Sequence, residues 1–132
     1  MIVEVILALS LLPLFVTAVV GALVYYHDSF SFMAEKARAV AYAQEGLEAA
    51  RNIRDEQFSN LTEGSYGLTI DQNNHWSFAG TSDVQGVFTR QIFINSLNPS
   101  LFQVEARVTW LYNGQQQGTV SLMTYESNWR NQ

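Results

Sequence analysis

The residues that could do chemistry are few and lie far apart in the chain. The two histidines, His27 and His75, do not have the spacing of a metal-ligand pair. The adjacent carboxylates Asp55 and Glu56 follow Arg54, which is typical of a solvated helix end. The chain has no cysteine, so disulfides, thiolate metal ligands and a cysteine nucleophile are excluded. No serine lies in a nucleophile-elbow motif. We therefore expect no enzyme, no catalytic residue, no metal and no cofactor.

The charge balance points away from nucleic acids. The chain has 132 residues and a net charge of −5, and its seven Lys and Arg residues are scattered. Because nucleic-acid binding needs a positive patch, we expect no nucleic-acid contact. One modification motif is present: Asn60-Leu61-Thr62 is an N-x-T sequon in an expected loop, so Asn60 is a possible glycosylation site.

The most informative ionisable residue is Glu4, at the edge of an otherwise apolar run. Residues 5–26 carry no charged side chain. At about 1.5 Å per residue, that run spans roughly 33 Å, enough to cross a bilayer core. It lacks the basic residues and the small-residue cleavage site of a secretory signal, and Tyr25 and Tyr26 suit a membrane interface. We expect the segment to be retained as a transmembrane helix.

An amphipathic helix is predicted to continue from the apolar run. Residues 31–58 are rich in strong helix formers, and no Pro-rich or Gly-rich break precedes them. Apolar residues recur with helical spacing, so one stripe is expected to pack on another element. That predicted helix–sheet packing stripe consists of Val40, Ala43, Leu47, Ala50 and Ile53.

The remainder of the chain has the pattern of an antiparallel sheet. Residues 65–70, 75–79, 87–95, 101–112 and 118–127 are the expected strands, and 101–112 alternates most clearly between apolar and polar residues. Asn113-Gly114 is a strong hairpin signal. The expected fold is α+β: one helix over residues 1–58, divided into 1–27 and 28–58, and a globular domain of four or five antiparallel strands over residues 59–132.

The start of the chain, MIVEVILALSLLPLFVTAVVGAL, resembles the mature start of type IV pilins and pseudopilins. Members of that family carry a glutamate within the first few residues of a long apolar helix, and an antiparallel sheet follows. The stretch AYAQEGLEAARNIRD is similar to the second half of the helix in bacterial minor-pilin-like proteins. The plan covers all 132 residues.

The resemblance implies an assembly role for Glu4 and Met1. In the family, the glutamate pairs with the N-terminal amine of a neighbouring subunit, an amine that is commonly methylated. An unpaired carboxylate among apolar helices is costly, so the pairing would fix the register of the subunits. The alternative is that Glu4 lies in the lipid headgroup region. The family's glutamate is usually the fifth mature residue, so either one residue precedes Met1 or the spacing differs here.

Pro13 and Gly21 are predicted to break the helix. Proline removes a backbone hydrogen bond and glycine is a poor helix former. Family members often carry a Gly followed eight residues later by a Pro, and here the order is swapped. We expect residues 13–21 to be extended in an assembled filament, or simply kinked, because transmembrane helices tolerate proline.

The function that the resemblance implies is structural. We expect a subunit of an extracellular type IV pilus-like filament that polymerises through its N-terminal helix. The role of the filament would be adhesion, motility, DNA uptake or secretion. Its partners would be copies of itself, other pilins, a prepilin peptidase and the pilus assembly machinery. Before assembly the helix would be inserted in the cytoplasmic membrane. The alternatives are a pseudopilin of a secretion or DNA-uptake system, and a single-pass membrane-anchored binding or adhesion module.

Overall fold

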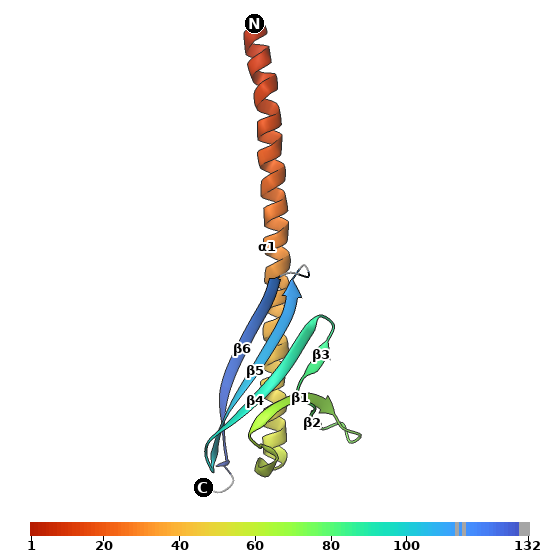
Figure 1. Cartoon of the computed structure of the whole chain (residues 1–132), viewed down its shortest axis with the longest axis vertical. Coiled ribbons are helices and arrows are strands. Elements are labelled where there is room, and N and C mark those ends of the chain that lie inside the picture. The colour runs from red at the N-terminus through yellow and green to blue at the C-terminus, as the bar shows by residue number, and fades with distance from the viewer. Residues whose placement is uncertain (113, 115, 130–132) are drawn as a thin grey trace. The chain divides into compact units, whose positions relative to one another are not determined.

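The computed structural model confirms the α+β class (Figure 1). It describes residues 1–112, 114 and 116–129. A long N-terminal helix, α1, is followed by a short 3-10 turn, η1, and then by strands β1 to β6. The chain divides into two compact units, Met1–Glu35 and Lys36–Gln132. The first unit is helix alone, and the second holds the rest of α1 and the whole sheet.

Helix α1 runs from Ile2 to Glu56 without interruption. Its second half is rich in Ala, Glu, Arg and Leu, which lose little side-chain freedom in a helix. Arg54 lies in the last turn, where a cation interacts favourably with the helix dipole. The chain then becomes extended at Gln57 and forms η1, Phe58–Asn60. Sequence periodicity therefore predicted one continuous helix with ends within about two residues of those observed.

The sheet is antiparallel, with the strand order β2-β1-β4-β5-β6 and with β3 also paired to β4. The bounds are β1 Gly64–Ile70, β2 Trp76–Ala79, β3 Asp83–Gln85, β4 Phe88–Asn98, β5 Leu101–Tyr112 and β6 Gln116–Ser127. The three longest strands, β4, β5 and β6, form a meander in which β5 is the middle strand and β6 lies at one edge of the sheet. Strand β3 is an addition to the expected set, because three residues are too few to show an alternating pattern.

The hairpin between β5 and β6 has the expected position. Tyr112 pairs with Gln116, so the turn lies between these two residues. Gly114 has a φ of 69°, a left-handed conformation that glycine adopts without strain. Asn113, the other half of the predicted turn signal, lies outside the described residues.

Small residues on α1 allow the helix to lie close to the sheet. The buried face of the helix consists of Ala39, Tyr42, Ala43, Gly46, Ala49, Ala50 and Ile53. A Cβ atom on Gly46 would lie 2.9 Å from Ile92 Cδ1 and 3.0 Å from Arg90 Cδ, so a larger residue at this point of α1 would crowd two side chains of β4. Of the stripe expected from sequence, Ala43, Ala50 and Ile53 are buried, whereas Val40 and Leu47 are partly exposed at its border.

Gly118 on β6 provides space for a large aromatic ring. Trp110 and Gly118 are paired across β5 and β6, and a Cβ on Gly118 would overlap the six-membered ring of Trp110. We expect Gly118→Ala to lower the free energy of unfolding by about 2 kcal/mol, because the ring must leave its position in the core. Urea unfolding of the full chain in detergent, followed by tryptophan fluorescence, measures the change. Ser121→Ala, an exposed position on the same strand, is the control and should change stability by less than about 0.5 kcal/mol.

Candidate functional site

The first half of α1 presents an apolar surface with no protein cover. Every residue from Met1 to Asp28 is exposed, including large side chains such as Leu9, Leu14 and Phe15. Soluble monomers rarely expose contiguous apolar surface on this scale. Among the described residues, α1 is the one helix long and apolar enough to cross a membrane. The surface Met1–Asp28 is therefore the leading candidate for a functional site, and lipid or other apolar helices are what it can bind.

Glu4 carries the one charged side chain of this surface before Asp28. Its Oε2 atom lies 3.6 Å from the backbone nitrogen of Met1, and both groups are exposed. An exposed ion pair in water contributes little, so this contact does not fix the conformation of Glu4. In lipid or among apolar helices the same carboxylate needs a cationic partner, because a buried lone charge is strongly unfavourable.

Two hydroxyl side chains of the apolar half are satisfied by the helix itself. The hydroxyl of Ser10 donates to the Leu7 carbonyl at 2.8 Å, and that of Thr17 donates to the Pro13 carbonyl at 2.7 Å. Back-bonding of this kind hides hydroxyl groups from an apolar environment. Ser10 and Thr17 therefore need no external partner, which distinguishes them from Glu4.

The two expected helix breakers lie inside an unbroken helix. Pro13 is in the interior of α1, and a Cβ on Gly21 would meet no atom within 4 Å. The extended conformation of residues 13–21 was predicted for the assembled state, so it stays a prediction. The open surroundings of Gly21 leave room for a close approach by another helix.

A buried arginine links α1 to the sheet in the second unit. Arg90 on β4 is 2% exposed, and its guanidinium donates to Asp83 at 2.8 and 3.2 Å. It also donates to the Tyr42 carbonyl at 3.1 Å and to Glu45 at 3.3 Å, and it stacks on the Tyr42 ring. Asp83 in turn accepts from the backbone N–H of Leu68 at 3.0 Å and from the Tyr42 hydroxyl. Four elements, α1, β1, β3 and β4, thus meet at one charge pair.

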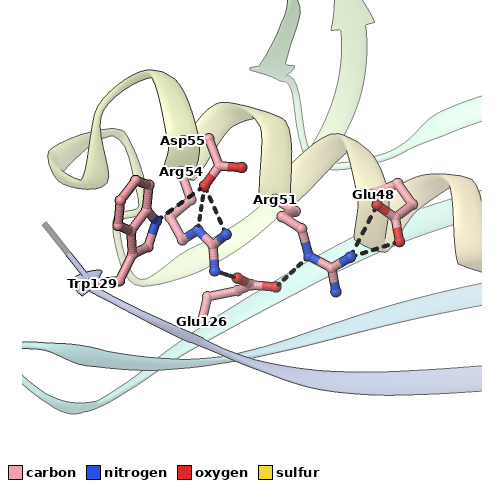
Figure 2. Close-up of polar contacts among 6 residues, drawn as sticks. All are labelled: Glu48, Arg51, Arg54, Asp55, Glu126 and Trp129. Carbon is pink, nitrogen blue, oxygen red and sulfur yellow. Dashed lines mark hydrogen bonds and ion pairs between the residues drawn. The ribbon is translucent and has the colours of Figure 1, made fainter.

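A second polar cluster joins the end of α1 to the end of β6 (Figure 2). The Glu126 side chain is 1% exposed and contacts Arg54 directly, while its other oxygen lies 3.7 Å from Arg51 Nε. Arg51 also binds Glu48 at 2.9 Å, and Arg54 binds Asp55 at 2.7 Å. Asp55 accepts a long bond of 3.5 Å from the indole of Trp129.

Burial is the largest cause of the pKa shift of one group in each cluster. It raises the pKa of the Glu126 carboxyl although Arg54 and Arg51 oppose it. Burial and the hydrogen bond to Asp83 raise the pKa of the Tyr42 hydroxyl. Both clusters hold elements together, since neither brings a nucleophile and a base to an open cleft.

Arg90 and Glu126 were not among the residues singled out from sequence, although a signal existed. In β4, Arg90 alternates in phase with Ile92 and Ile94, and in β6, Glu126 alternates in phase with Val120 and Leu122. Period-2 alternation therefore placed both charges on the apolar side of their strands. A charge in that position must have a partner across the core.

The remaining sequence candidates lie apart from one another. His75 Nδ1 is 3.0 Å from Glu56 Oε1, which ties the β1–β2 turn to the end of α1, whereas His27 lies on the exposed half of the helix. Residues 1–112, 114 and 116–129 contain no group of three or more His, Cys, Asp or Glu placed to hold a metal ion. Asn60 is exposed at the end of η1, and Thr62 of the same sequon shares a 2.7 Å hydrogen bond with the Tyr66 hydroxyl.

Comparison of the chain with protein-family models, curated proteins and solved structures finds no match. The candidate site consequently depends on the physical properties of the Met1–Asp28 surface and of Glu4.

Proposed function

We propose that the chain is the structural subunit of an extracellular type IV pilus-like filament and that copies polymerise through the apolar half of α1. The observation that carries this proposal is the exposed apolar surface Met1–Asp28, in which Glu4, near the start, is the one charged side chain before Asp28. Lipid can cover the apolar side chains, but it gives Glu4 no fixed cationic partner. A bundle of copies can do both.

Glu4 acts in this proposal as a register-setting residue. As the helices gather, each Glu4 pairs with a cationic group, the N-terminal amine, at the start of a neighbouring helix. A helix in the wrong register leaves the carboxylate unpaired among apolar side chains, which costs several kcal/mol. The pair thus contributes specificity of assembly more than stability.

The same apolar surface serves the subunit both before and after assembly in this proposal. Before assembly, α1 is inserted in the cytoplasmic membrane, where a prepilin peptidase processes the chain and the assembly machinery extracts it. After assembly, the apolar halves form the filament core, and the sheet unit faces the outside. Adhesion or motility then belongs to the filament as a whole.

Two other functions use the same features differently. A pseudopilin of a secretion or DNA-uptake system would form a short assembly through the same helix. A single-pass membrane-anchored binding or adhesion module would need α1 for anchorage alone, which its length and apolar character allow. The module needs no carboxylate at position 4, whereas the two assembling proteins do. A requirement for Glu4 therefore distinguishes them from the module.

Replacing Glu4 with alanine is expected to leave the chain in the membrane but to reduce filament yield at least tenfold. Without the carboxylate, wrong registers are no longer penalised, so the correct register loses its advantage. A free-energy advantage of about 1.4 kcal/mol corresponds to a factor of ten in population. Filaments sheared from cells and counted by electron microscopy give the yield, and carbonate extraction of membranes gives the insertion. Ser10→Ala, in the same helix with a self-satisfied hydroxyl, is the control and should assemble normally.

Normal filament yield from Glu4→Ala would contradict the register-setting role. Helical averaging of wild-type filaments would further show whether residues 13–21 are helical or extended and whether Glu4 meets a neighbouring amine. Detergent-soluble monomers without any filament would favour the membrane-anchored module.

A further inference from the structure

Strand β6 forms a long unprotected edge of the sheet (Figure 1). It pairs with β5 from Leu101↔Ser127 to Tyr112↔Gln116 without a bulge, and no described strand pairs with its other side. Proteins usually protect such an edge with lysines, prolines, bulges or shortness. Strand β6 has twelve residues, no Lys, Arg or Pro, and one charged residue, Glu126, which is buried against Arg54 and Arg51.

On the β3 side, no strand of the described residues pairs with the outer edge of β3, although Asp83 at its start accepts from the Leu68 N–H of β1. Strand β3 forms its ladder with β4 at Asp83↔Arg90, Val84↔Thr89 and Gln85↔Phe88. Its one charge, Asp83, is held inward by Arg90, so the edge presents no outward charge. Val84, which alternates with Asp83, is 67% exposed on the outer face of the sheet.

Strand directions make these two edges compatible. The strands β3, β4, β5 and β6 are each antiparallel to the next, so β6 runs opposite to β3. A second copy in the same orientation, placed beside β6, would therefore present its β3 antiparallel to β6 and continue the alternation. Two β6 strands could pair antiparallel only through a two-fold axis, which would also reverse the direction of the α1 segment packed on each sheet.

We propose that neighbouring copies join edge to edge, with residues 83–87 of one copy adding to β6 of the next as an extra antiparallel strand. The inference rests on the proposed function, because filament subunits share one orientation. The contact is heterologous, so it does not close on itself and can repeat along an assembly. Backbone hydrogen bonds join the strands, as in other cases of β-augmentation.

Side chains on the outer face set the register. Met123 and Tyr125 on β6 are 53% and 60% exposed and alternate with residues that face the helix. Val84 of the added strand lies on the same outer face, so it can pair with Met123 in the ladder. A cross-strand apolar pair of this kind removes both side chains from water.

A disulfide cross-link tests the proposal, because the chain has no cysteine of its own. The full chain with Val84→Cys and Met123→Cys together is expressed in cells, oxidised mildly and run on a non-reducing gel. We expect a ladder of covalent multimers, since the two cysteines of one chain lie on opposite edges and each must bond to a different neighbour. Each single variant should remain monomeric. Ser121→Cys and Tyr125→Cys, each combined with Val84→Cys, test the adjacent registers.

The control pairs Met123→Cys with Thr69→Cys, an exposed β1 position outside residues 83–87, and should give no ladder. Dimers from Met123→Cys alone would indicate β6–β6 pairing and overturn the proposal. Filaments without a cross-link in any register would overturn it while the proposed function stands. The absence of both filaments and cross-links would overturn both. A ladder without filaments would support the edge contact and count against the filament.

Discussion

Replacing Arg90 with methionine is expected to lower the free energy of unfolding by about 3–5 kcal/mol, the cost of removing one partner from a buried ion pair. Arg90 is 2% exposed, and Asp83 opposite it is 18% exposed. Without the guanidinium, Asp83 keeps a negative charge near the helix–sheet interface with only the Leu68 N–H and the Tyr42 hydroxyl as partners. Urea unfolding in detergent, followed by tryptophan fluorescence, measures the loss.

Arg107→Met provides the matched control for Arg90. Arg107 lies on the outer face of β5, is 42% exposed, pairs with Glu105 at 2.9 Å and stacks on Phe93. Exposed pairs contribute less than about 1 kcal/mol, so its loss should be small. Equal effects of the two substitutions would show that the buried position of Arg90 does not matter. The double variant Arg90→Met/Asp83→Asn should recover part of the stability, because it removes the stranded charge.

Local periodicity explains how much of the fold could be predicted. Apolar residues at helical spacing from Val40 to Ile53, and strict alternation from Phe102 to Trp110, are signals carried by neighbouring residues in the chain. Strand β3 has no such signal, because three residues are too few to show an alternation; its place is set by its ladder with β4 and by Asp83, which binds Arg90 and the Leu68 N–H.

The site could be predicted in part for the same physical reason. Composition alone located the apolar surface and made Glu4 stand out within it. The partner of Glu4 in the proposed filament belongs to another chain, so one chain cannot supply it. The burial of Arg90 and Glu126 followed from alternation, but their counter-charges, Asp83 and Arg54, come from other elements that only the folded chain brings near.

Replacing Arg54 with methionine is expected to destabilise the chain by about 3 kcal/mol at neutral pH. Glu126 is 1% exposed and loses its direct partner, keeping Arg51 at 3.7 Å, which limits the loss to the lower end of the usual range. Unfolding curves of the full chain at several pH values measure the effect.

The penalty of Arg54→Met should depend on pH. Burial already raises the pKa of Glu126 above its ordinary value near 4.5, and losing Arg54 raises it further. A raised folded-state pKa means that the folded chain holds a proton that the unfolded chain has released. Stability from that proton is complete below about pH 4.5 and is lost as the pH rises through the folded pKa. The penalty should therefore be small in acid and largest at neutral pH.

Glu126→Gln separates the charge from the shape of the side chain. Glutamine keeps the volume of Glu126 without a carboxylate to desolvate, so this variant should be at least as stable as wild type at neutral pH and should lack the fall in stability above pH 4.5. Combined with Arg54→Met, it should abolish the pH dependence of the penalty. The penalty of Arg54→Met could instead be equal at pH 4 and pH 7. That result would show that the packing of the arginine side chain, and not the charge of Glu126, holds the end of β6 to α1.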